Sequence, residues 1–199
     1  MKKLLILLFA ILVSFNSYGS WFDKTVCVKT DAQDRDDIIY LLNKTKPFSG
    51  KNLCKHENGQ NKSKGKVKDG KKNDIWTEWY ENGQIKSEKN YKDGKKNGKF
   101  ISWYGNGQIL KEENYKDGKK NGKFTLLYDN GQIKLEENYI GGKKNGKWTW
   151  WHENGQKVRQ KNYKDGKKDG KQTDWNKNDQ KWVEAIFING ECISGDCDY

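Results

Sequence analysis

The 199-residue sequence has little proline, histidine, methionine or arginine, with one Pro, two His, one Met and two Arg. Only 33% of its residues are hydrophobic, which is too few for the deep core of a large globular enzyme. This composition also excludes a collagen, a coiled coil and a transmembrane bundle. Aromatic residues are nevertheless frequent, with 9 Trp, 10 Tyr and 7 Phe, which argues against a fully disordered chain.

Motifs of known catalytic chemistry are missing as well. The sequence contains no G-x-S-x-G, no P-loop, no dinucleotide fingerprint and no H-E-x-x-H. With only His56 and His152, and without CxxC-type spacing, we expect no metal site. The carboxylate pairs are better explained as cross-strand ion pairs with lysines of adjacent hairpins; they are Glu112, Glu113, Glu136 and Glu137. We therefore expect no enzyme activity, no cofactor and no small-molecule substrate.

The N-terminus has the pattern of a secretory signal. Lys2 and Lys3 precede the apolar run 4–13, and the small residues of Ser17-Tyr18-Gly19 predict cleavage after residue 19. The apolar run is too short to span a bilayer, which needs about 20 residues. Removal of residues 1–19 would lower the formal net charge from +12 to +10. We expect an exported protein that is periplasmic, in the cell envelope or extracellular.

Four cysteines lie at the two ends of the chain that remains after cleavage. Cys27 and Cys54 are near its start, whereas Cys192 and Cys197 are near its end. Export would place them in a compartment that permits disulfides. Four cysteines allow three pairings, of which the most economical is Cys27–Cys54 with Cys192–Cys197.

An internal repeat of 24 residues dominates the sequence. The tripeptide Asn-Gly-Gln begins at five equally spaced positions, and Asn178-Asp179-Gln180 continues the series; the five are Asn58, Asn82, Asn106, Asn130 and Asn154. Because no insertion interrupts the spacing, each unit must occupy the same structural position. We therefore divide the chain into the signal 1–19, a non-repeating lead-in 20–39, and a repeat array 40–199 with a degenerate C-terminal cap.

Each unit has the turn signals of a β-hairpin. Asn-Gly favours a tight turn because both residues tolerate positive φ, and a longer turn is expected over Lys92–Gly98. Strands are expected at about 84–91 and 99–104, and a helix is conceivable only at 36–42. The predicted fold is all-β, an elongated antiparallel meander of 24-residue hairpin repeats.

Aromatic residues recur at fixed positions of the unit. Phe100 and Trp103 belong to two such positions, which would face opposite sides of an ideal strand. Either a bulge intervenes or both faces of the sheet carry rings. In both cases, cross-strand ring contacts should stabilise the sheet by roughly 0.2–1 kcal/mol per pair.

The repeat resembles the MORN repeat in its bacterial variant form. The resemblance rests on residues 91–100, Trp103-Tyr104 and 106–108, and the same spacing recurs from Tyr115, Tyr139 and Tyr163. It implies an elongated β-hairpin sheet used for protein contacts and, in some members, for lipid or membrane association. Many bacterial relatives are named antitoxins, but an exported chain could not readily neutralise a cytoplasmic toxin.

Lysines of the longer turns are the first candidate binding residues. If these turns share one sheet edge, their lysines form a basic rim that attracts an anionic envelope component or an acidic protein. The alternative is that they only keep exposed turns soluble and block edge-to-edge aggregation. The candidates are Lys92, Lys95, Lys96, Lys99, Lys116, Lys119, Lys120 and Lys123. Export and the scarcity of arginine argue against nucleic acid as the partner.

Aromatic residues are the second set of candidates. Secreted hairpin arrays of the cell-wall-binding type hold cations or sugars in aromatic cages, although their period and motifs differ from those found here. The candidates are Trp103, Tyr104, Tyr128, Trp148, Trp150 and Trp151. The preferred hypothesis is a non-catalytic secreted scaffold that binds a protein or an anionic envelope surface, including peripheral membrane contact. A glycan-binding module and an antitoxin-like protein are the alternatives.

Overall fold

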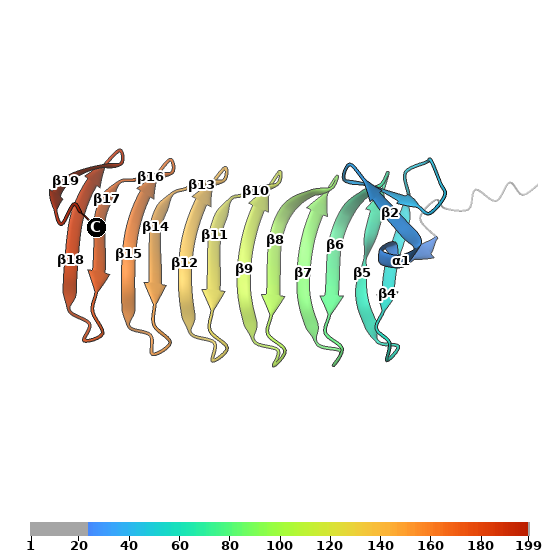
Figure 1. Cartoon of the computed structure of the whole chain (residues 1–199), viewed down its shortest axis with the longest axis horizontal. Helices are drawn as coiled ribbons and strands as arrows, with labels where there is room; N and C mark the ends of the chain where they lie inside the picture. The colour runs from blue at the N-terminus through green and yellow to red at the C-terminus, as the bar shows by residue number, and fades with distance from the viewer. Residues whose placement is uncertain (1–23, 199) are drawn as a thin grey trace, which may run out of the picture.

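The computed structural model describes residues 24–198, so the expected signal at 1–19 lies outside the described residues. Within this range, seventeen strands form one long sheet and two more form a small second sheet. Between residues 50 and 195, the strands of successive hairpins lie side by side and are antiparallel, which gives an elongated array (Figure 1). Three of these strands are divided into two segments that pair with the same neighbour. The all-β meander predicted from the sequence is confirmed. In residues 24–198, no helix is long and apolar enough to cross a membrane.

The elements follow the repeat closely. Ahead of the array are β1 (Thr25–Val26), α1 (Val28–Asp31), β2 (Ala32–Arg35) and β3 (Ile38–Leu41). The first hairpins of the array are built from β4 (Gly50–Lys55), β5 (Asn61–Lys68), β6 (Lys71–Trp79), β7 (Ile85–Lys92), β8 (Lys95–Trp103) and β9 (Ile109–Lys116). The later ones contain β10 (Lys119–Lys120), β11 (Gly122–Leu127), β12 (Ile133–Ile140), β13 (Lys143–Lys144), β14 (Gly146–Trp151), β15 (Lys157–Lys164), β16 (Lys167–Lys168), β17 (Gly170–Trp175), β18 (Lys181–Ile188) and β19 (Glu191–Gly195).

Two kinds of turn alternate along the array. Asp93 and Gly94 both have positive φ, 49° and 82°, as a two-residue type I′ hairpin requires. The expected longer turn over 92–98 is therefore a tight turn at Asp93-Gly94, because β8 already begins at Lys95. At the other turn, Gly83 has positive φ but Asn82 does not, and the Asn82 side chain accepts the backbone N–H of Gln84 at 3.0 Å. The expectation of positive φ at both Asn-Gly residues was wrong.

A β-bulge answers the question of aromatic parity. In the pairing of β8 with β9, Phe100 lies opposite Glu113, but the register shifts between Ser102 and Trp103. The same shift occurs before the equivalent residues Trp79, Leu127, Trp151 and Trp175. A bulge therefore separates the Phe100 and Trp103 positions, and its extra residue is Leu110 of β9. We call the side of the sheet that carries Phe100 the aromatic face and its reverse the open face.

The lead-in closes the N-terminal end of the array. Ile39 of β3 packs with Phe48, Val67 and Trp76 in a core cluster whose members are at most 8% exposed. No helix forms at 36–42, the one place where the sequence left a helix conceivable: residues 36 and 37 form a turn and β3 pairs with β2. The exclusion of helices elsewhere was wrong, because the short helix α1 lies at Val28–Asp31. The boundary expected at residue 40 falls inside β3, while the first hairpin of the long sheet begins at Gly50.

Each end of the described chain carries one disulfide. Cys27 is bonded to Cys54, which ties the segment before α1 to β4. Cys192 is bonded to Cys197, which closes the chain beyond β18. The predicted pairing is confirmed.

Candidate functional site: lysine edge and aromatic face

Four Asp-Gly turns and the equivalent Gly141-Gly142 turn project from one edge of the sheet, and the Asn-Gly turns project from the other. In Figure 1 the former lie at the upper edge, next to β10, β13 and β16. We call this the lysine edge, formed by the turns 68–71, 92–95, 116–119, 140–143 and 164–167. These five turns carry nine exposed lysines and four exposed aspartates. With two strands per repeat, successive turns lie about 10 Å apart and the row is about 40 Å long.

Hydrogen bonds stack the turns on one another. The backbone N–H of Gly94 donates to the carbonyl of Lys72 at 2.9 Å, and that of Gly118 donates to Lys96 at 2.8 Å. The pattern continues through Gly142, Gly166 and Gly190. The stem of Lys71 lies beside Gly94, with its Cβ 3.4 Å from where a Cβ on the glycine would be. The lysine edge is therefore held in place by backbone contacts.

The eight lysines proposed from the sequence divide among three surfaces. Lys92, Lys95, Lys116 and Lys119 lie on the lysine edge, as expected. Lys96 and Lys120 instead lie over rings of the aromatic face. Lys99 and Lys123 are ion-paired with Glu112 and Glu136 of the neighbouring strand; the Lys99–Glu112 distance is 2.9 Å. These two pairs are the cross-strand ion pairs expected from the sequence.

The aromatic face holds a ladder of tilted rings. Phe100 contacts Tyr91 on one side and Tyr115 on the other, with ring centroids 5.4 and 4.8 Å apart. Trp148 has the same arrangement between Tyr139 and Tyr163, at 5.1 and 5.2 Å. Phe100 and Trp148 are only 4% and 3% exposed, so these rings hold neighbouring strands together.

The aromatic candidates are divided between this ladder and the Asn-Gly edge. Trp148 is buried in the ladder and Trp150 lies against it, with centroids 6.0 Å apart. Tyr104 and Tyr128 donate their hydroxyls to backbone carbonyls one repeat further on, those of Leu127 and Trp151, at 2.8 and 2.9 Å. The carbonyl of Trp103 accepts the equivalent hydrogen bond from Tyr80 at 2.8 Å. The proposed aromatic residues therefore form no single cage.

A row of lysines covers the rings. The sequence did not distinguish these lysines from those of the turns. The Nζ of Lys144 lies 4.3 Å from the centroid of Trp148 and 4.9 Å from that of Tyr163. The equivalent lysines of the other repeats also lie over rings: Lys72, Lys96, Lys120 and Lys168. Each such contact stabilises by about 0.5–1 kcal/mol where the cation is solvated. Strand alternation from Phe100 back to Lys96 is the sequence signal that could have revealed the row.

Carboxylates in the middle of the aromatic face are held ionised by their neighbours. Glu113 is 8% exposed, and its carboxylate lies 2.9 Å from Lys111 Nζ and 3.5 Å from Lys120 Nζ. Burial opposes ionisation, but the hydrogen bond and charge of Lys111, with Tyr115 and Lys120, hold the pKa of Glu113 below its usual value. Burial, followed by the charge and hydrogen bond of Glu113, raises the pKa of Tyr115 to about 12.

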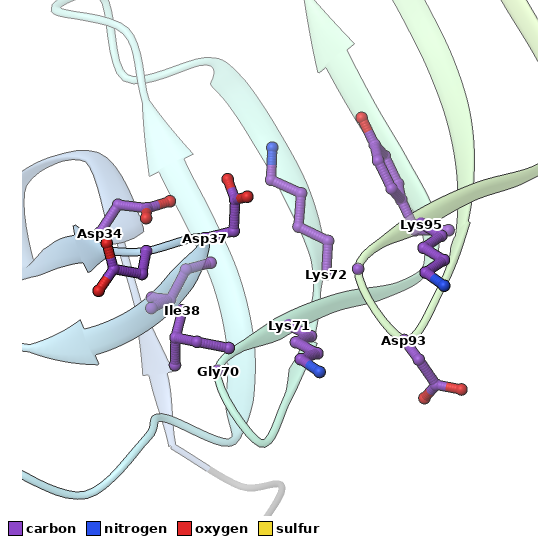
Figure 2. Close-up of a pocket in the computed structure, with 12 residues that line it drawn as sticks. Asp34, Asp37, Ile38, Gly70, Lys71, Lys72, Asp93 and Lys95 are labelled. Carbon is purple, nitrogen blue, oxygen red and sulfur yellow. The ribbon is translucent and has the colours of Figure 1, made fainter. Parts of the chain in front are cut away.

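A hollow of about 510 Å³ lies where the β2–β3 hairpin meets the first turns of the lysine edge. Figure 2 shows Asp34 and Asp37 on one side of Lys72, with Asp93 and Lys95 on the other. Burial and the charge of Lys89 lower the pKa of Lys72, against the opposing charges of Glu78 and Asp34. Among residues 24–198, no group of three or more His, Cys, Asp and Glu side chains could hold a metal ion. Four aspartates and three lysines line the hollow, whereas lysines outnumber aspartates along the lysine edge as a whole.

Comparison with known families identifies the repeat. The family model of the MORN repeat variant matches four consecutive segments: residues 75–93, 96–117, 120–140 and 144–165. Each segment spans the two strands joined by an Asn-Gly turn and ends at the lysine edge or close to it. A comparison with curated proteins finds no match. The ring ladder lies within the matched residues. Most of the lysine edge falls between or outside the matched segments, which contain three of its nine lysines: Lys92, Lys116 and Lys164.

Proposed function

Because residues 75–165 consist of four consecutive MORN repeats of the variant type, we propose that this chain is a non-catalytic scaffold that binds an anionic surface of the cell envelope through its lysine edge. MORN repeats are generally motifs that bind proteins or membranes, and the motif itself is non-catalytic. The chemistry of the lysine edge selects an anionic partner from that broad range.

The observation that carries the proposal is the arrangement of charge along the edge. Nine exposed lysines against four aspartates give the five turns an excess of positive charge. Their glycine N–H groups bond to the preceding turn, so the charges are presented in a fixed row. A row about 40 Å long can contact many anionic groups at once, and such attraction weakens as salt rises.

The proposed location follows from the expected signal at 1–19 together with the cysteines. All four cysteines of the described chain are in disulfides, which persist in oxidising compartments and are rare in the cytosol. An exported protein would meet acidic polysaccharides, anionic head groups and acidic proteins of the envelope.

The alternatives have weaker support. A glycan cleft needs accessible ring faces, but Trp148 is buried and the hydroxyls of Tyr104 and Tyr128 are engaged by backbone carbonyls. An antitoxin-like role requires a cytoplasmic location, which two disulfides argue against. An acidic protein remains the second candidate partner, since it would use the same lysines.

Co-sedimentation with vesicles tests the proposal. The purified, disulfide-bonded protein is mixed with anionic or neutral vesicles at low and at high salt. We expect it to pellet with anionic vesicles at low salt, and to lose most of that binding at high salt because the charges are screened. Failure to pellet with anionic vesicles at low salt would refute the envelope-surface proposal and leave an acidic protein as the candidate.

A further inference from the structure

We propose that the C-terminal end of the aromatic face holds a site for a hydrogen phosphate group, either free or carried on a hydroxylated molecule. The site is a cavity of about 50 Å³ whose lining includes Arg159, Lys161, Lys168 and Gln172. It lies on the aromatic face and not among the exposed turns. It is therefore independent of the lysine edge and of the function proposed for that edge.

Three lysines gather here without carboxylate partners. Lys161 lies opposite Trp148 in the pairing of β14 with β15, and Lys144 Nζ lies 4.3 Å from the centroid of that Trp148 ring. Lys168 Nζ lies 4.4 Å from the ring centroid of Phe187. Among residues 24–198, no carboxylate oxygen lies within 4.0 Å of the ammonium groups of these three lysines. The cluster can accept an anion.

Electrostatic repulsion within the cluster supports the same conclusion. Burial, and then the positive charges of Arg159 and Lys168, lower the pKa of Lys161, with a smaller effect from Lys144. Asp174 opposes this shift without reversing it. A bound anion would relieve the repulsion and favour the charged form of Lys161.

Two carboxylates, Asp174 and Asp196, also line the cavity, and both already have partners within the protein. Asp174 forms a bidentate pair with Arg159, with Nε to Oδ1 at 2.8 Å and a terminal nitrogen to Oδ2 at 2.6 Å. Asp196 accepts the backbone N–H of Glu184 at 3.2 Å. Glu137, on the strand before Trp148, accepts the Tyr139 hydroxyl at 2.8 Å. Lys144, Lys161 and Lys168 are therefore available to bind a ligand.

The buried side chain of Gln172 favours a ligand that can donate a hydrogen bond. Its side chain is nearly fully buried at 5% exposure, and its Nε2 donates to the carbonyls of Asn162 and Gly170 at 3.0 and 3.1 Å. Because both partners are acceptors, the amide orientation is fixed, and its Oε1 is buried without a hydrogen-bond partner. An unpaired buried acceptor destabilises the folded protein. A ligand whose P–OH or neighbouring hydroxyl donates to this oxygen would remove this destabilisation.

The unpaired lysines and the buried acceptor of Gln172 occur together only in the last repeats of the described array. The position of Lys161 holds Glu113 and Glu137 in the two preceding repeats and Lys89 before those, where Lys89 is neutralised by Glu78 at 3.2 Å. The position of Gln172 holds an aromatic residue in each of the four preceding repeats: Trp76, Phe100, Phe124 and Trp148. A polar acceptor and unpaired lysines therefore coincide at one place in the array. Lys89 supplies a matched control.

Isothermal titration calorimetry of the purified, disulfide-bonded protein tests the site with inorganic phosphate, glycerol 3-phosphate and sulfate. Sulfate has similar shape and charge but no O–H donor at neutral pH. We expect phosphate or glycerol 3-phosphate to bind at least tenfold more tightly than sulfate. Tighter binding of inorganic phosphate would indicate a free phosphate ligand, and tighter binding of glycerol 3-phosphate would indicate a phosphate group on a hydroxylated molecule. Equal binding of all three anions, or binding of none, would overturn the proposal.

Two variants locate the binding. Lys161→Gln should weaken phosphate binding at least tenfold, whereas the equivalent Lys89→Gln should change it less than twofold. Both positions lie on the aromatic face, and neither belongs to the exposed turns. The melting temperature of each variant is measured without ligand to show that it folds. A similar loss in both variants would reject a discrete site, and neither result depends on vesicle binding by the lysine edge.

Discussion

The hydroxyl of Tyr104 donates a hydrogen bond to the backbone carbonyl of Leu127, 2.8 Å away and 23 positions later in the chain. Tyr80 and Tyr128 make the same bond to Trp103 and Trp151. The bond joins neighbouring repeats close to the Asn-Gly edge, just as the glycine N–H bonds join them at the lysine edge. Hydrogen bonds between neighbouring repeats therefore stabilise this single-layer sheet at both of its edges.

Replacement of Tyr104 by Phe removes this bond but keeps the ring. We expect the free energy of unfolding to fall by about 1 kcal/mol, the usual net value of a hydrogen bond whose acceptor is left unpaired. Urea denaturation followed by tryptophan fluorescence measures it. Tyr40→Phe is the control, because within residues 24–198 the Tyr40 hydroxyl makes no such bond. Equal effects of the two substitutions would show that the bond is not stabilising.

Gly98, which lies within β8, should resist substitution. Gly98 has φ of 90°, and a Cβ there would lie 3.4 Å from Asn90 Nδ2. Gly98→Ala should lower the free energy of unfolding by about 1–2 kcal/mol, since L-residues are strained at such φ. Gly105 is the control: it lies outside the positive-φ set and a Cβ on it would meet nothing within 4 Å. An unchanged melting temperature in Gly98→Ala would contradict the positive φ of Gly98 within β8.

The two disulfides should differ in their effect on stability. The Cys27–Cys54 bond closes a sequence separation of 27 residues, whereas Cys192–Cys197 closes 5. By loop entropy, removing the first should cost roughly 3–4 kcal/mol and the second roughly 2 kcal/mol. Thermal unfolding of the two double alanine variants compares them. A larger loss from the C-terminal pair would mean that it holds β18 and β19 in place by more than loop closure.

Low pH should lower the stability of the fold because Glu113, in the middle of the aromatic face, becomes protonated. Its pKa is lower folded than the model-peptide value of 4.5, so its contribution is present above pH 4.5 and is lost as pH falls through the folded pKa. Glu113→Gln should therefore lose less stability than the parent protein between pH 5 and 3, at the cost of lower stability at pH 7. Urea midpoints at a series of pH values measure this. Parallel curves for the two proteins would exclude the assignment.

Much of the architecture could be predicted from the sequence because it depends on local spacing. An uninterrupted series from Asn58 to Asn154 required identical units, and Gly-containing turns every few residues required hairpins. The pairing of Cys27 with Cys54 followed from their position near one end of the chain, with the other two cysteines near the other end. These features depend on turn chemistry and on neighbouring strands, which the sequence records directly.

The placement of side chains depended on details that spacing alone does not give. A tight turn at Asp93-Gly94 begins the next strand at Lys95, which directs Lys96 to the aromatic face instead of the edge. The bulge before Trp103 could not be located without the pairing register. The burial of Gln172 without a partner for its Oε1 is a tertiary property, so the cavity around it was not expected.

Charge-matched variants in the vesicle assay test the central claim most directly. One variant replaces four lysines of the lysine edge by Gln: Lys92, Lys95, Lys116 and Lys119. The other replaces four exposed lysines outside those turns: Lys62, Lys64, Lys86 and Lys177. Both lose the same net charge, so only the position of the charge differs. We predict that the edge variant loses at least fivefold of its binding to anionic vesicles at low salt, while the other loses less than twofold. Equal losses would contradict a binding role for the lysine edge and would mean that net charge alone drives the attraction.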